Sequence, residues 1–368
     1  GMSLGLSMAG LGSKTSGRIE TVAAADIWTP ACATFESNLG IKPHNSGVDK
    51  RLIRRILSSV GKVDLVVGGP PCQGFSTSGK RALDDERNHL VKAFLQAVEL
   101  AEPSAFILEN VVGFTSFQNG KILEEVIERG KKLGFTVHPG VVLASRFGVP
   151  QRRRRFILIG ERTGNFEFPN TLPKRDTPTS GFLEVDQRAD DDFRVVTFDE
   201  ATNDLPVLES GEQADIYKIV GREMLSKYQQ WSRKGSPALD LHVASRHGSE
   251  FVRMMSYVPQ GKSALDPDVK MPRELRPTSG FPNSYARIRG NEPAPTITRN
   301  FTTPSSANCI HPYQNRALSL REGARCQSFP DSFKFLGTHS EIRLQIGNAV
   351  PPLLSKGLGE ALLRSLSN

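Results

Sequence analysis

One cysteine of the chain lies in a loop suited to holding a reactive side chain. Residues 68–76 read GGPPCQGFS and directly follow an apolar run at 63–67. A Val-rich run closed by Gly-Gly-Pro-Pro predicts a buried strand that ends in a loop. The prolines fix φ before Cys72, and the glycines allow close approach of the backbone. An isolated cysteine in such a turn is usually structural, but this setting favours a nucleophile.

A carboxylate is expected at the same edge of the predicted sheet. Apolar residues recur at helical spacing over 87–101, and a second apolar run at 105–108 leads into Glu109. This pattern predicts a strand, a helix and a parallel neighbouring strand. Because the carboxyl ends of parallel strands meet at one rim, we expect Cys72 and Glu109 to face one cleft.

Four consecutive arginines follow Gln151 and run into the apolar residues 156–159. If this segment is extended, Gln151, Arg153 and Arg155 share one face, and Arg152 and Arg154 share the other. One face could serve a reactive site and the other could bind phosphates. A solvated basic run is the alternative, although the strand that follows would anchor the segment.

Composition limits the class of protein. The 368 residues suffice for one large and one smaller domain, and Lys and Arg exceed Asp and Glu by 47 − 39 = 8, which favours a polyanionic partner. No run of about 18 apolar residues is present, and the first residues lack a secretory pattern, so we expect no membrane partner and a cytoplasmic location. The four cysteines form no CxxC pair, so neither a metal site nor a disulfide framework is expected.

The remaining elements are predicted from periodicity and capping. Further helices are expected over 29–38, 49–60, 122–133 and 353–366, and a helix capped by Ser319 is expected to run through Arg325 to 329–331. Strands are expected over 21–26, 137–143 and 155–159, the last two as an antiparallel pair. The stretch 168–282 is rich in turn-forming residues and predicts irregular structure with short strands. Asp26 would end the strand 21–26, where an acid commonly binds ribose hydroxyls in nucleotide-binding α/β folds.

Four motifs together resemble the cytosine-C5 DNA methyltransferases of the bacterial modification type. They are the Cys72 loop, Glu109-Asn110-Val111, the QxRxR pattern at 151–155 and the GNAVPP segment at 347–352, in the family's order. The resemblance covers nearly the whole chain. It implies an α/β, doubly wound Rossmann-like methyltransferase sheet, expected to lack its first strand, and a smaller, mostly irregular and β target-recognition domain. The implied limits are 1–167 for the catalytic domain, 168–298 for target recognition and 299–368 for a segment returning to the catalytic domain.

The resemblance also implies residue roles. Cys72 would attack C6 of cytosine, Glu109 would engage N3, and Arg155, supported by Arg153, would contact the ring oxygen. S-adenosyl-L-methionine would donate the methyl group, bound by Asp26, Ile27, Pro70, Leu90, Asn348 and Val350. DNA would be contacted by Gln73, Ser76, Thr296 and Ile297.

The implied partner is double-stranded DNA from which the target base is flipped. A cognate restriction endonuclease in the same system and a monomeric state are also expected. A transfer-RNA methyltransferase is a rival that the Pro-Pro-Cys-Gln loop and the sizeable middle segment argue against. A catalytically silent DNA-binding fragment is a second rival, because residues 1–6 resemble only the tail of the family's FxGxG cofactor loop. On that view we expect weak cofactor binding by residues 1–368.

Two other enzyme classes are disfavoured by the sequence. A nicotinamide oxidoreductase would carry a GxGxxG motif, which the sequence lacks. A cysteine hydrolase would need a histidine placed as the base, and the sequence places none.

Overall fold

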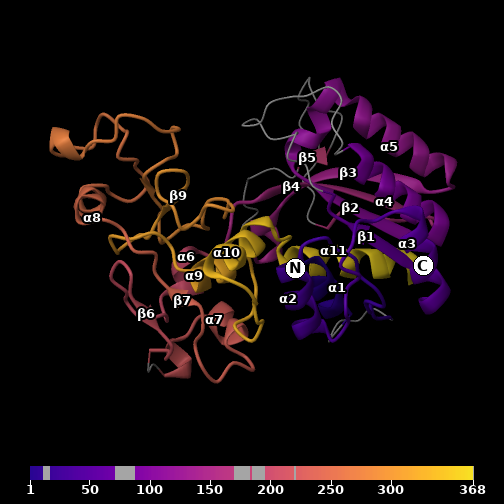
Figure 1. The fold of residues 1–368 in the computed structure, drawn as a ribbon, viewed down its shortest axis with the longest axis horizontal. Helices are drawn as coiled ribbons and strands as arrows, with labels where there is room; N and C mark the ends of the chain where they lie inside the picture. The colour runs from indigo at the N-terminus through magenta and orange to yellow at the C-terminus, as the bar shows by residue number, and fades with distance from the viewer. Residues whose placement is uncertain (11–16, 71–87, 170–182, 185–194, 219–220, 368) are drawn as a thin grey trace. The chain divides into compact units, whose positions relative to one another are not determined.

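The computed structural model of the chain describes residues 1–10, 17–70, 88–169, 183–184, 195–218 and 221–367. It contains two compact units (Figure 1). The sheet unit comprises Leu6–Leu143, Arg154–Arg188 and Lys356–Asn368, and the arginine unit, named for its buried arginines, comprises Gly1–Gly5, Ala144–Arg153 and Ala189–Ser355. These units do not follow the limits expected at 167 and 298, since 299–355 groups with 195–298. The limits of a target-recognition domain stay a prediction.

The sheet unit is built on a five-stranded mixed sheet of order β1-β2-β4-β3-β5 (Figure 1). The strands are β1 Leu65–Gly68, β2 Ala105–Asn110, β3 Thr136–Leu143, β4 Arg154–Glu161 and β5 Leu183–Glu184. β1 runs parallel to β2, whereas β4 is antiparallel to both β2 and β3. The predicted strand–helix–strand unit and the predicted antiparallel pair are therefore both confirmed.

Helices α4 (Asn88–Ala101) and α5 (Lys121–Lys132) cover one face of this sheet. Phe106 of β2 packs edge-on against Phe94 and Phe135, with ring centroids 6.0 and 5.1 Å away. Residues 105–108 of β2 are fully buried, as expected for a central strand with both faces covered. This packing fixes the rim at which β2 ends.

Two further helices of the sheet unit also follow the predicted ranges. Helix α2 spans Thr29–Leu39 and α3 spans Lys50–Val60, where the Asp49 carboxylate accepts the Leu52 N–H as an N-cap. The unit shares α1 (Met2–Met8) and α11 (Pro352–Ser367) with the arginine unit. The 3₁₀ helix η1 spans Val112–Gly120.

The strand predicted over 21–26 is wrong. In this segment only Ala25 pairs, through an isolated parallel bridge to His44. Three consecutive alanines have low β propensity and little surface to pack, so the apolar run does not extend into a ladder. Asp26 nevertheless ends the segment in a defined conformation, as described below.

The arginine unit has short elements, as predicted for 168–282. Its strands form two pairs, β6 Gln213–Ala214 with β7 His242–Val243 and β8 Ala286–Arg287 with β9 Asn308–Ile310. Its helices are α6 Phe198–Thr202, α7 Lys227–Ser232, α8 Ser249–Ser256, α9 Leu320–Cys326 and α10 His339–Asn348, with 3₁₀ turns η2 Ala144–Phe147, η3 Arg222–Met224 and η4 Arg273–Leu275. Helix α9 starts at the predicted Ser319 cap, which forms a capping box with Glu322. It ends at Cys326, before the predicted end at 329–331, and Ser328 has a positive φ that a helix cannot continue through.

Buried ion pairs hold the arginine unit together. Arg316, Arg321 and Arg325 are each 0% exposed. Arg316 donates to both carboxylate oxygens of Glu322, at 2.8 and 2.7 Å. Buried charges of this kind are tolerated because each has a partner.

Asp331 is the centre of a second buried network. Its carboxylate accepts hydrogen bonds from Arg325 at 3.0 and 2.7 Å, from Arg321 at 3.3 Å and from the Tyr217 hydroxyl at 2.8 Å. Burial alone would raise the pKa of Asp331, but the neighbouring guanidinium charges hold it below its usual value. Arg325 also pairs with Asp204, so one cation neutralises two buried acids.

His311 should make the arginine unit sensitive to mild acid. Burial lowers its pKa to about 3, and the charges of Arg316 and Arg287 add to this against the opposing charge of Glu322. An unfolded histidine takes up a proton near pH 6.5 and the folded one does not, so its stabilising contribution is present above about pH 6.5 and is lost as the pH falls.

Protonation of His311 in the unfolded chain should lower the free energy of unfolding by about 1.4 kcal/mol for each pH unit between about pH 6 and 5. Urea unfolding of the native chain and of His311→Asn at these pH values would measure the difference in slope. Asparagine retains an acceptor for the N–H groups of Tyr313 and Gln314, which His311 Nδ1 accepts at 3.2 Å each. Equal slopes would contradict the assignment.

Candidate active site

Two of the predicted reactive groups form an ion pair at the rim of the sheet. Glu109 lies near the end of β2 and Arg155 near the start of β4, and the antiparallel register sets Glu109 opposite Ile157. Arg155 Nε lies 2.8 Å from Glu109 Oε1, and each side chain is 13% exposed. A charge-assisted pair of this kind holds a carboxylate and a cation in one place, and each side chain keeps part of its surface exposed.

The backbone that leads into the cysteine loop lies against this pair. A Cβ on Gly69 would stand only 3.1 Å from Glu109 Oε2, so the residue type allows the close approach. The next residue, Pro70, offers its carbonyl to Asn110 Nδ2 at 3.3 Å, and Asn110 is itself buried. The Asn of the motif at 109–111 therefore tethers the end of the β1 segment beside Glu109, a role that the sequence motif alone does not predict.

Cys72, Gln73 and Ser76 lie outside the described residues. The other three cysteines are buried. Burial raises the pKa of the thiols of Cys32, Cys309 and Cys326, with smaller contributions from neighbouring groups. None of these three is suited to forming a thiolate.

Arg153 is placed in the arginine unit and is 2% exposed. Its guanidinium donates to the carbonyls of Ile297 at 2.8 Å, Gly347 at 3.0 Å and Ala349 at 3.2 Å. These contacts join the arginine run to the 297 segment and to the GNAVPP segment. Arg153 is therefore a positioning residue in this geometry.

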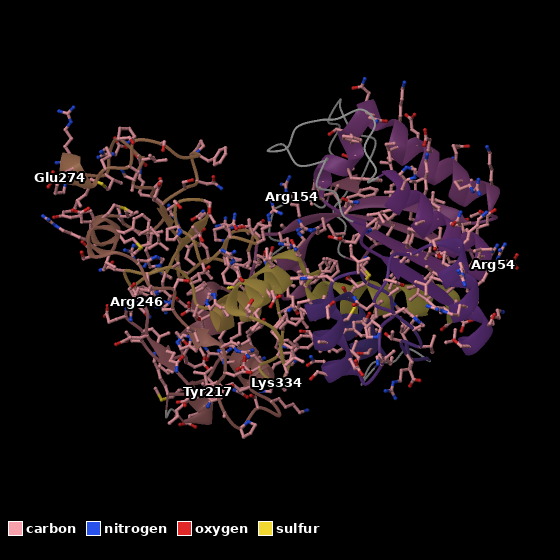
Figure 2. All side chains as sticks on the ribbon, viewed as in Figure 1. Arg54, Arg154, Tyr217, Arg246, Glu274 and Lys334 are labelled. Carbon is pink, nitrogen blue, oxygen red and sulfur yellow. The ribbon has the colours of Figure 1, made fainter. Side chains whose placement is uncertain are left out.

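Gln151 makes the matching connection from the same face. It is fully buried, its Oε1 accepts the Ile297 N–H at 2.7 Å, and its Nε2 donates to the Cys326 carbonyl at 3.0 Å. Arg152 and Arg154 are exposed, and Arg152 pairs with Glu292 (Arg154 is labelled in Figure 2). The predicted alternation of faces along the arginine run is thus confirmed.

Thr296 and Ile297 differ in exposure. Thr296 is exposed, and its hydroxyl donates to the Arg152 carbonyl at 3.0 Å. Ile297 is 2% exposed, and both its N–H and its carbonyl are bonded to Gln151 and Arg153. Thr296 can meet a ligand, whereas Ile297 holds Thr296 in place.

Asp26 and Ile27 form a small exposed site in the sheet unit. Asp26 Oδ1 accepts the Trp28 N–H at 2.9 Å, and the Asp26 carbonyl accepts from Asn45 Nδ2 at 3.1 Å. Ile27 is 74% exposed, which is unusual for a large aliphatic side chain. A carboxylate beside an exposed apolar surface can bind a diol and a flat apolar ring.

The other predicted cofactor residues are distributed over both units. Leu90 is half-buried on α4, and Pro70 ends the described part of the β1 segment. Asn348 is exposed at the end of α10, and Val350 is buried, both in the arginine unit. Within the described residues, no group of three or more His, Cys, Asp or Glu is arranged to hold a metal.

Comparison with known proteins gives the family. The family model for the C-5 cytosine-specific DNA methylases matches residues 1–364. The chain belongs to this family. Type II methyltransferase M1.HphI of Haemophilus parahaemolyticus is 34% identical over 323 residues, which cover 87% of this chain and 73% of that protein. Type II methyltransferase M.AgeI of Thalassovita gelatinovora is 30% identical and is matched over 94% of both chains.

The solved structures support the fold. A candidate DNA modification methyltransferase encoded within a prophage (E. coli) superposes with a TM-score of 0.74 at 22% identity, covering 100% of this chain and 96% of that one. The S. pombe Dnmt2 methyltransferase superposes with a TM-score of 0.56 at 16% identity over 95% and 92% of the two chains.

The expected α/β methyltransferase fold and family are thereby confirmed. The protein is a DNA (cytosine-5-)-methyltransferase, which acts on DNA and requires a methyl donor. None of its described helices has the length and apolar character needed to span a bilayer.

Proposed function

We propose that the protein transfers a methyl group from S-adenosyl-L-methionine to C5 of a cytosine flipped out of duplex DNA, through a covalent bond between Cys72 and C6. The ion pair between Glu109 and Arg155 is the observation that carries this proposal. It supplies an acid for a ring nitrogen and a cation for a ring oxygen at one partly open position. Cytosine offers N3 and O2 side by side to such a pair.

The proposed groups account for each bond that forms or breaks in the reaction. The Cys72 thiolate forms a bond to C6, and the displaced electron pair moves into the ring, where Glu109 stabilises N3 and Arg155 stabilises O2. The cofactor, when bound, supplies an electrophilic methyl group to C5. A positioned water then removes the C5 proton, the electron pair re-forms the C5–C6 double bond, and the thiolate leaves.

Cys72 is favoured as the nucleophile by elimination and by covalent distance. The other three cysteines are buried, with raised thiol pKa values. Cys72 follows Pro70 closely in sequence, and two residues of chain span at most about 7 Å. Asn110 holds the Pro70 carbonyl, so the described end of the segment that precedes Cys72 lies beside Glu109.

Asp26 and Ile27 fit the cofactor. The free carboxylate oxygen of Asp26 would accept hydrogen bonds from the ribose hydroxyls, and the exposed Ile27 would pack on adenine. Asn45 and His44 fix the Asp26 backbone, so both side chains are held in place without a ligand. Pro70, Leu90, Asn348 and Val350 are proposed as further cofactor contacts.

On the DNA side, Gln73, Ser76 and Thr296 are proposed as contacts, with Ile297 positioning Thr296. The relatives named Type II methyltransferases favour a role in a restriction–modification system, and so a cognate restriction endonuclease as a functional partner. We further propose a monomer that works in the bacterial cytosol.

Covalent trapping tests the mechanism. With duplex DNA carrying 5-fluorocytosine and with the cofactor present, the native chain should form a stable protein–DNA adduct, because fluorine at C5 prevents the final elimination. Cys72→Ala should form none, whereas Cys309→Ala, which removes a buried thiol in the core, should still form it. An adduct with Cys72→Ala would refute the assignment of the nucleophile. In a separate assay with labelled cofactor, duplex DNA and transfer RNA, methyl label found only in the RNA would contradict the proposed reaction on DNA.

A further inference from the structure

A basic cavity within the arginine unit is not used by the proposed chemistry. Its volume is about 410 Å³, and its lining comes from residues 245–251, 302–305 and 339–343. These segments are the turn before α8, the loop after Phe301 and the first turns of α10. The volume lies within the range of ordinary small-ligand sites.

The lining is positively charged and carries no acidic residue. Two arginines contribute, Arg246 from the turn before α8 and Arg343 from α10 (Arg246 is labelled in Figure 2). In the part of the chain that the structure describes, neither forms an ion pair, in contrast to the three paired arginines of the core. An arginine pair without a carboxylate leaves several N–H donors for an anion.

Arg343 has a donor left over. Its Nη1 contacts Thr303 Oγ1 at 3.4 Å, which holds the guanidinium at the cavity wall. Its Nε is buried and has no hydrogen-bond acceptor among the described residues. A buried N–H without a partner is costly, so a bound anion near this side chain would offset the cost.

One of the two histidines of the lining, His247, adds a neutral donor. His247 Nε2 accepts the Ala317 N–H at 3.3 Å, so the neutral ring carries its proton on Nδ1. The pKa of His247 is lowered by burial and, to a smaller extent, by the charge of Arg316. The pKa of His339 is lowered by burial and, to a smaller extent, by the charge of Arg343. Hydroxyls of Thr302, Thr303, Ser305 and Ser340 complete a lining that is typical of phosphate sites.

We propose that this cavity, the phosphate pocket, binds one backbone phosphate of the DNA substrate. The inference rests on DNA being the substrate of the family, and it does not need the covalent mechanism proposed above. The wall segment 302–305 follows Ile297 by only a few residues in the chain, and Ile297 is held by hydrogen bonds to Gln151 and Arg153. A phosphate bound there would set the register of the arginine unit on the duplex without reading sequence.

The test compares charge-removing variants at matched positions. Arg246→Gln and Arg343→Gln should each weaken binding of a duplex by about tenfold, as expected for a lost charged hydrogen bond. The slope of log K against log salt, measured by fluorescence anisotropy between about 50 and 200 mM salt, should fall by about 0.9 for one lost phosphate contact. Both losses should be the same for duplexes of different sequence.

Arg253→Gln is the control. Arg253 is exposed on α8, does not line the cavity, and its replacement removes the same charge. We expect the affinity of this variant for DNA to stay within about twofold of that of the native chain, because a side chain that contacts no phosphate releases no counterion. An equal loss in Arg253→Gln would show a diffuse basic field and overturn the proposal. Arg246 lies in an exposed turn, so its variant keeps the test valid if Arg343→Gln fails to fold.

Two further measurements distinguish a DNA phosphate from a free phosphate ion as the ligand, and distinguish this proposal from the proposed covalent mechanism. Calorimetry with inorganic phosphate should show no more than weak binding, because the pocket is matched to a phosphate delivered by the duplex. Tight phosphate binding that Arg343→Gln removes, with unchanged DNA affinity, would mean a small-anion site and would overturn the proposal. Affinity is measured without cofactor on unmodified DNA, so a failure of covalent trapping leaves this result unaffected.

Discussion

Replacement of Glu109 by glutamine should lower the rate of methyl transfer to DNA by about 10²–10⁴-fold, the usual loss when a positioned acid–base group is removed. Glutamine has nearly the same shape and can stay beside Arg155, but it cannot share a proton with N3 or carry the charge that Arg155 pairs with. The measurement is the single-turnover rate with labelled cofactor on duplex DNA. The loss should be in rate, with the tether from Asn110 to Pro70 intact.

Glu99→Gln is the matched control for this prediction. Glu99 pairs with Arg129 at the exposed surface of α4, so the same chemical change there costs at most about 1 kcal/mol of stability and should leave the rate unchanged. A rate for Glu109→Gln within threefold of the native chain would remove the acid from the mechanism. In a chain that already carries Glu109→Gln, the further change Arg155→Gln should lower the methyl-transfer rate much less than Arg155→Gln lowers it in the native chain. The reason is that the effects of two residues that act as one unit are not additive.

The rim of the sheet could be predicted because local patterns determine it. The apolar run at 105–108 can only be a central strand, and the residue that follows it must emerge at the edge. The arginine run alternates its faces because a strand has period two. The partner of Arg155, by contrast, depends on the register between β2 and β4, which no short-range pattern contains.

The wrong strand prediction and the contacts that the sequence does not predict also have physical causes. The segment 21–26 is apolar enough to suggest a strand, but alanine gives a ladder too little side chain to pack. The link from Asn110 to Pro70 joins residues 40 positions apart, and the contacts of Arg153 reach residues up to 196 positions away. Such long-range hydrogen bonds leave no periodic signal in a single sequence. The phosphate pocket is similar, since its three wall segments are brought together only by folding.

The buried network around Asp331 should dominate the stability of the arginine unit. Arg325→Met leaves the carboxylates of Asp204 and Asp331 buried without their shared cation, and we expect a loss of about 3–5 kcal/mol in the free energy of unfolding. Asp331→Asn should cost less, because Arg325 keeps Asp204 and Arg321 keeps Asp240. Urea unfolding at pH 7 would measure both losses.

Lys334→Met is the control for the network, because Lys334 pairs with Asp240 at an exposed position and its loss should cost at most about 1 kcal/mol (Tyr217 and Lys334 are labelled in Figure 2). The expected order of destabilisation is therefore Arg325→Met, then Asp331→Asn, then Lys334→Met. The order follows from what each change removes. Arg325→Met removes the cation shared by two buried acids, which keep only the longer contacts of Asp331 to Arg321 at 3.3 Å and of Asp204 to Arg233 at 3.7 Å. Asp331→Asn removes one acid from arginines that keep other partners, and Lys334→Met removes an exposed cation. If Arg325→Met were no more destabilising than Lys334→Met, apolar packing rather than paired charge would hold this unit together, and the buried arginines would need another explanation.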